Sequence, residues 1–162
     1  MLVGSNGSGK STLFRMIGGL IQPESGQVDC NVQTALVFQN PDHQLLLPSC
    51  GSDLLLNLPP TLAPSLKRKR IAHLLEQVGL EAGYVGRYPH EFSGGQRQRI
   101  GIARALALSP RFLVLDEPIS ALDVSIQSQI VNLLSDLKQR LRLTYLFISH
   151  DLSMVEYISD RV

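Results

Sequence analysis

The chain has 162 residues, a formal net charge of +1 and a hydrophobic fraction of 44%. This length fits one domain with its own core, and this composition excludes a chain that is disordered throughout. The balanced charge provides no basic field for nucleic acid, so we expect no nucleic-acid partner. No apolar run approaches the roughly 18 to 20 residues that a membrane span requires. Cys30 and Cys50 lack the spacing of a zinc site, which predicts two reduced thiols.

A glycine-rich loop follows the short apolar segment Leu2-Val3. It matches the pattern G-x-x-x-x-G-K-[ST], in which glycines let backbone N–H groups surround a phosphate. Apolar residues then recur at helical spacing to about Leu20, so the positive end of a helix faces the same phosphate. The lysine would reach the β- and γ-phosphates, and the serine hydroxyl would ligate Mg²⁺. We expect ATP to be bound by Gly4, Ser5, Asn6, Gly7, Ser8, Gly9, Lys10, Ser11 and Thr12.

Three short apolar runs alternate with stretches of helical periodicity, which predicts an α/β fold. The expected strands cover 35–38, 112–115 and 145–148, and the expected helices cover about 11–20, 65–78, 92–106, 124–140 and 152–159. This alternation indicates a mostly parallel sheet that is covered on both faces. Residues from about 49 to 88 differ, because they contain Pro59, Pro60 and Pro64, and we expect a mostly helical insertion there.

Polar residues follow each expected strand, at the edge where open α/β sheets bind their ligands. Asp116 occupies the position at which P-loop enzymes hold Mg²⁺. Glu117 beside it would orient or deprotonate the attacking water, and such help is typically worth about 10²–10⁴-fold in rate. Gln39 and His150 are the corresponding polar residues after the other two strands.

A second anion-binding pattern lies far from the first loop, at Ser93-Gly94-Gly95. A serine hydroxyl, free backbone N–H groups and the positive end of a helix would meet there. The simpler interpretation is a serine that only caps the helix. One chain needs two phosphate cradles of this kind only if they serve different molecules.

Taken in order, these motifs resemble the ATP-binding subunit of ATP-binding-cassette (ABC) transporters. Phe92 and the run SGGQRQRIGIARAL at 93–106 match the signature motif of that family, and the acidic pair and the Ser-Ala-Leu-Asp loop at 120–123 follow it. Gln39 matches its Q-loop, and His150 matches its switch histidine. The resemblance implies one domain over 1–162. Its P-loop NTPase core would cover about 1–40 and 94–162, and its helical subdomain about 41–93.

The family also implies a mechanism. Two such domains pack head to tail, so that ATP on one P-loop is capped by the signature residues Ser93, Gly94, Gly95 and Gln96 of the other. Asp123 would lie at the same interface. The catalytic residues would be Glu117 as base, His150 at the γ-phosphate, and Gln39 at Mg²⁺ or the water. The metal site would comprise Ser11, Gln39 and Asp116.

The partners implied are a second ABC ATP-binding domain and transmembrane permease subunits. The chain would then be cytoplasmic and peripheral on the inner face of the cell membrane. Residues 87–92 and 120–127 resemble the dipeptide, oligopeptide and nickel importers, whereas 38–45 resemble the energy-coupling-factor type for vitamins and metal ions. The first match is longer and favours import of peptides or nickel, and the second remains an alternative.

Two stretches depart from the family. Its members begin with an antiparallel β-layer that carries an aromatic residue for stacking on adenine, whereas Met1 lies three residues before Gly4. We therefore expect this layer to be missing. The stretch between Gly26 and Gln33 is short as well. These departures motivate a second hypothesis, a truncated cassette that binds nucleotide without turnover. A soluble mechanochemical ATPase acting on nucleic acid is a third.

Overall fold

The structure, a computed structural model, describes residues 9–41 and 45–160. The expected loop residues 4–8 and the segment Leu2-Val3 lie outside these ranges. The described elements are α1 (Lys10–Ile17), β1 (Thr34–Val37), α2 (Cys50–Leu56), α3 (Pro64–Gln77), the 3-10 helices η2 (Ala82–Gly86) and η3 (Pro89–Glu91), α4 (Gly94–Ala107), β2 (Phe112–Asp116), α5 (Val124–Leu141), β3 (Thr144–Ile148) and α6 (Leu152–Ile158). The expected strands and helices are all present, and the α/β fold is confirmed.

The three described strands form one parallel sheet in the order β1-β2-β3. Leu36 of β1 pairs with Val114 of β2, which in turn pairs with Leu146 of β3. Because parallel strands need crossover connections, helical segments separate them in the sequence and cover the sheet. The carboxyl ends of all three strands therefore meet at one edge, where their following polar residues gather.

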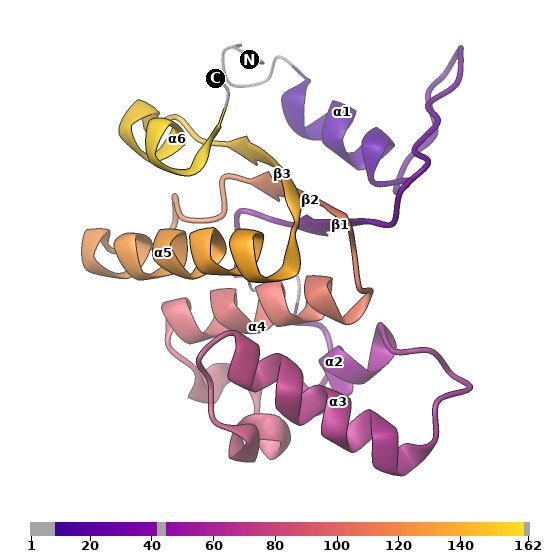
Figure 1. Ribbon diagram of the computed structural model, residues 1–162, viewed down its shortest axis with the longest axis vertical. Coiled ribbons are helices and arrows are strands. Elements are labelled where there is room, and N and C mark those ends of the chain that lie inside the picture. Colours follow the sequence, from indigo (N-terminus) through magenta and orange to yellow (C-terminus); the bar gives the residue numbers. More distant parts are fainter. Residues whose placement is uncertain (1–8, 42–44, 161–162) are drawn as a thin grey trace.

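The two faces of this sheet are covered unequally. Successive strand residues point to opposite faces, and one face joins the buried residues of α4 and α5 in the main core. The strand residues of that face include Ala35, Val37, Leu113 and Leu115. On the other face α1 buries one side chain, Phe14, and its C-terminal Gly18 lies directly against Leu36. Figure 1 shows the strands between α1 on one side and α4 and α5 on the other.

The helical segment between β1 and α4 shares the core of the strands. Its buried leucines Leu54, Leu74 and Leu75 belong to the same cluster as the strand residues. Pro64 occupies the first turn of α3, where a missing N–H costs nothing. Ser49 caps α2 by accepting a hydrogen bond from the backbone N–H of Ser52 at 3.3 Å. Helices α2 and α3 pack on α4, which lies between them and the sheet (Figure 1).

Within the described ranges, every helix is too short or too polar to cross a membrane.

Candidate functional site

Glu117 is the centre of a small polar cluster at the carboxyl edge of the sheet. Its Oε2 accepts a hydrogen bond from Nε2 of Gln39 at 3.3 Å and lies 3.5 Å from Nδ1 of His150. The Glu117 side chain is 22% exposed and that of His150 is 72% exposed. The carboxylate is thus sheltered while the imidazole faces solvent. The structure brings together, from the ends of three different strands, the three residues expected to be catalytic.

The backbone of Glu117 adopts an uncommon conformation. Its φ angle is 46°, in the left-handed region that non-glycine residues rarely occupy. Such a residue typically costs about 1–3 kcal/mol and persists where its surroundings hold it. Its N–H donates to the carbonyl of Ile148 at 3.1 Å. Its own carbonyl accepts from both the N–H and the hydroxyl of Ser120, at 3.3 and 3.1 Å. The strained backbone therefore coincides with the expected general base.

Gly9 and the first turn of α1 are the described part of the glycine-rich loop. Gly9 is the N-cap of α1 and has a φ angle of 86°, which suits glycine because it lacks a Cβ. Helix α1 packs against β2, and Ser11 and Thr12 in its first turn are exposed. The N–H groups of a first helical turn have no intrahelical acceptors, so this turn can receive an anion.

Ser93 caps α4 through a reciprocal pair of hydrogen bonds. The N–H of Gln96 donates to Oγ of Ser93 at 3.3 Å, and the N–H of Ser93 donates to Oε1 of Gln96 at 3.0 Å. This capping box satisfies two backbone donors at the helix start. Ser93 therefore caps α4, and its hydroxyl is also exposed to solvent.

Gly95, the second glycine after Ser93, permits close packing on the start of α5. A methyl group built on Gly95 would lie 2.6 Å from Cγ2 of Ile126, and one built on Gly94 would lie 3.4 Å from Cδ2 of Leu122. Side-chain contacts of this kind are ordinarily about 3.5–4.0 Å long. Position 95 therefore requires glycine, because any Cβ would displace α4 or Ile126.

Asp116 and Asp123 flank Glu117 along the chain. Asp116 is the last residue of β2 and is half-buried opposite Ile148. Asp123 is exposed at the N-cap of α5, where its side chain makes no capping hydrogen bond. Mg²⁺ takes oxygen ligands and usually binds through one or two carboxylates together with substrate phosphates. The carboxylate of Asp116 and the hydroxyl of Ser11 are donors of that chemistry.

The structural contacts of Gln127 and Asp53 are not indicated by the sequence. Nε2 of Gln127 donates to the carbonyls of Ile119 and Leu122, at 3.1 and 3.0 Å. The carboxylate of Asp53 is fully buried and accepts hydrogen bonds from backbone N–H groups of the preceding loop. Both hold a loop by its backbone, which a single sequence does not reveal.

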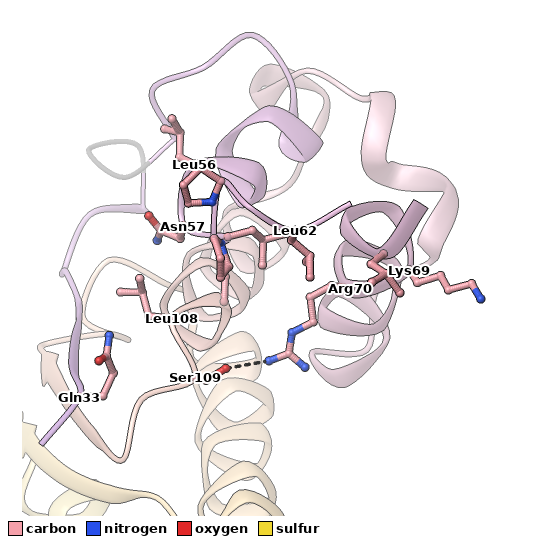
Figure 2. A pocket seen from close by; sticks show the side chains of 13 residues that line it. Gln33, Leu56, Asn57, Leu62, Lys69, Arg70, Leu108 and Ser109 are labelled. Atoms are coloured by element: carbon pink, nitrogen blue, oxygen red, sulfur yellow. Dashed lines mark hydrogen bonds between the residues drawn. The ribbon is translucent and has the colours of Figure 1, made fainter. Parts of the chain in front are cut away.

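An apolar groove of about 860 Å³ lies at the opposite edge of the sheet. It is lined largely by leucine and proline, with Lys69 and Arg70 among its polar residues, and Arg70 donates to Oγ of Ser109 at 3.2 Å (Figure 2). Gln33 and Ser109, which also line it, precede β1 and β2 respectively. The groove is therefore at the amino ends of the strands and is separate from the cluster around Glu117.

The sequence profile of the ABC transporter family matches residues 1–120 of the chain. The oligopeptide transport ATP-binding protein OppF of Bacillus subtilis is 48% identical, over 99% of this chain and 60% of its own length. A Brucella abortus protein described as a candidate peptide import ATP-binding protein is 52% identical, over 99% of this chain and 57% of its own. The chain thus spans somewhat less than two thirds of the length of these curated relatives.

Solved structures agree with the sequence relatives. The structure of cbiO1 from Clostridium perfringens, part of the ABC transporter complex cbiONQ, matches with a TM-score of 0.83 and 32% identity, over 98% of this chain and 69% of that one. A dimeric post-hydrolysis state of the ATP-binding cassette MJ0796, bound to ADP and Pi, matches with a TM-score of 0.76 and 28% identity, over 94% and 75%. The expected P-loop core is confirmed by these neighbours. The chain belongs to the ABC transporter family.

Proposed function

We propose that the chain is the ATP-binding and ATP-hydrolysing part of a membrane importer for peptides or nickel, and that it acts as a head-to-tail dimer. The observation that carries this proposal is the position of the Glu117 carboxylate between Gln39 and His150. The names of the curated relatives support peptides as the transported class. Membership in the family supports ATP as the nucleotide.

In this proposal the Glu117 carboxylate accepts the proton of the attacking water. The hydrogen bond from Gln39 to Oε2 would hold the carboxylate in place. The exposed imidazole of His150 is within reach of Glu117 and would contact the γ-phosphate. Ser11, Asp116 and Gln39 would hold Mg²⁺, which neutralises charge on the β- and γ-phosphates when bound. The loop and first turn of α1, from Gly4 to Thr12, would hold the phosphates.

The second half of the site would come from a partner cassette. Ser93 and Asp123 are both exposed, and Gly94 lies beside Leu122 in the loop that ends at Asp123. The exposed Ser93 and the exposed Asp123 therefore lie on neighbouring segments of the chain, which supports a shared interface there. We assign the core to about 1–40 and 94–162 and the helical subdomain to about 41–93. Permease subunits would position the dimer at the inner face of the membrane, with no nucleic acid involved.

The test is ATP turnover measured against protein concentration, with Glu117→Gln as the variant. The proposal expects turnover to rise with the square of concentration while the dimer is scarce, because two chains complete each site. Glu117→Gln should abolish turnover and retain ATP binding, since the amide cannot accept the proton. Glu156→Gln, an exposed position on α6, is the matched control and should leave the rate unchanged.

Two outcomes would contradict the proposal. Turnover of Glu117→Gln at the wild-type rate would remove Glu117 from its assigned role. Binding of ATP without turnover at any concentration of the wild type would instead favour a cassette that only binds nucleotide. The substrate class needs a separate measurement, namely co-purification with a polytopic membrane partner followed by uptake of a labelled peptide, nickel or a vitamin.

A further inference from the structure

The loop 117–123 is held by several hydrogen bonds. Both the N–H and the hydroxyl of Ser120 donate to the carbonyl of Glu117, and the N–H of Leu122 donates to the carbonyl of Ile119 at 3.1 Å. The side-chain amide of Gln127, from the first turn of α5, then donates to the carbonyls of Ile119 and Leu122, at 3.1 and 3.0 Å. One nitrogen with two hydrogens thus joins two points of the loop to α5.

The same unit touches the signature helix. Ile126, the neighbour of Gln127 in α5, packs on Gly95, and Leu122 of the loop packs on Gly94. Because a methyl group on Gly95 would lie only 2.6 Å from Cγ2 of Ile126, α4 and α5 are in direct contact here. The start of α4 therefore rests on the first turn of α5.

We propose that Gln127 is a positioning residue that locks the loop 117–123 to α5 and thereby links the signature glycines to Glu117 in the same chain. This inference rests on the proposed function, in which Glu117 serves one nucleotide and Gly95 caps another on the partner cassette. When the interface at the signature glycines closes, the fixed loop would place the Glu117 carboxylate of the same chain at the other nucleotide. Gln127 contacts neither nucleotide in this arrangement and acts through the loop backbone.

The physical reason is the geometry of the amide. Without its two donors, half-buried carbonyls at 119 and 122 lose a partner, and the loop can relax from the shape that holds Glu117 in its left-handed conformation. Catalytic rates are sensitive to such shifts, since a misplacement of about 1 Å can cost about 100-fold in rate. Nucleotide binding by the separate chain should be insensitive, because the phosphate loop and α1 of that chain would hold the phosphates.

The test compares Gln127→Met with Gln129→Met, using the chain in its dimeric, ATP-hydrolysing form. Methionine has nearly the size of glutamine but no donors, and Gln129 is exposed on the same helix. We expect Gln127→Met to lower kcat by about 10- to 100-fold with the ATP dissociation constant unchanged within about twofold. Gln129→Met should behave as the wild type. Gln127→Arg, whose guanidinium can donate to both carbonyls, should recover most of the lost kcat.

Several results would overturn the inference. A Gln127→Met enzyme with wild-type kcat would do so, and so would a loss that Gln127→Arg fails to recover. A parallel loss of ATP affinity would point to general damage to the fold instead. If Gln127→Met does not fold, the test is the ratio of kcat for Gln127→Arg to kcat for Gln127→Glu. Glutamate presents an acceptor to both carbonyls, whereas arginine presents donors. A ratio near one refutes the positioning role of Gln127. Absence of turnover in the wild type would refute the proposed function itself, which is a distinguishable result.

Discussion

Replacing Asp53 by alanine should destabilise the fold through the loop that joins Gln39 to α2. Oδ1 of Asp53 accepts from the N–H groups of Leu46 and Leu47 at 3.1 and 3.3 Å, and Oδ2 lies 3.3 Å from the second of these. The Asp53 side chain is fully buried. The substitution therefore leaves two peptide donors without an acceptor in a partly buried loop.

The magnitude follows from these contacts. Hydrogen bonds to a charged acceptor contribute about 1.5–3 kcal/mol each. Water can reach the half-buried donors and recover part of that loss, so we expect the free energy of unfolding to fall by about 3 kcal/mol. For a domain of this size each kcal/mol corresponds to about 2–4 °C in Tm. The predicted decrease in Tm is therefore about 6–12 °C.

Thermal unfolding followed by circular dichroism measures this decrease. Asp53→Asn retains one acceptor oxygen and should lose roughly half as much. Asp136→Ala is the control, because Asp136 is 53% exposed and its ion pair with Arg140 spans one helical turn. Such surface pairs contribute about 1 kcal/mol at most. A Tm for Asp53→Ala within about 2 °C of the wild type would refute the reasoning, as would an equal decrease in the control.

Other predictions concern packing, a buried thiol and a half-buried tyrosine hydroxyl. Gly95→Ala forces Cβ to within 2.6 Å of Ile126 and should lower the free energy of unfolding by about 1–3 kcal/mol. Adding Ile126→Ala in the same chain should recover part of this loss. Additive decreases in Tm for the two substitutions would contradict the contact. Burial raises the pKa of the Cys50 thiol from 9.0 to about 12, while Cys30 is exposed, so a thiol reagent at pH 8 should label one cysteine in the folded chain and two in denaturant. Because the folded pKa is the higher one, the stability contributed by the neutral Cys50 thiol is complete below about pH 9 and is lost as the pH rises toward 12. Tyr145→Phe removes a 2.9 Å hydrogen bond to a carbonyl of α5 and should lower the free energy of unfolding by about 1 kcal/mol in urea denaturation; an unchanged midpoint would contradict this.

The sequence alone predicted the elements whose pattern is local. Helices α4 and α5 have long apolar faces and begin after the polar residues Ser93 and Asp123, so their starts were recognisable. Helix α2 was not resolved as a separate element, because its seven residues lie in a proline-rich stretch without periodicity. The strands were each placed within one residue, since short β-branched and aromatic runs bounded by polar residues have few alternative interpretations.

The candidate site could likewise be predicted only in part from the sequence. Parallel strands bring their carboxyl ends together, which is why Gln39, Glu117 and His150 were expected at one edge before any distance was known. The left-handed conformation of Glu117 was not predictable, because nothing in a Glu-Pro sequence requires a positive φ angle. The role of Gln127 was also hidden, since its two acceptors are carbonyls whose positions depend on how the whole loop folds.

The few buried contacts of helix α1 bear on how a bound nucleotide would change the stability of this protein. Of its eight residues Phe14 alone is buried, so little apolar contact opposes local opening of this helix. Elements of this kind open with free energies well below that of global unfolding. A ligand held at the amino end of α1 adds stability by mass action, about 2.7 kcal/mol at one hundred times its dissociation constant. Nucleotide would then be a structural component of this face of the sheet, and slowed amide hydrogen exchange in α1 would report its occupancy.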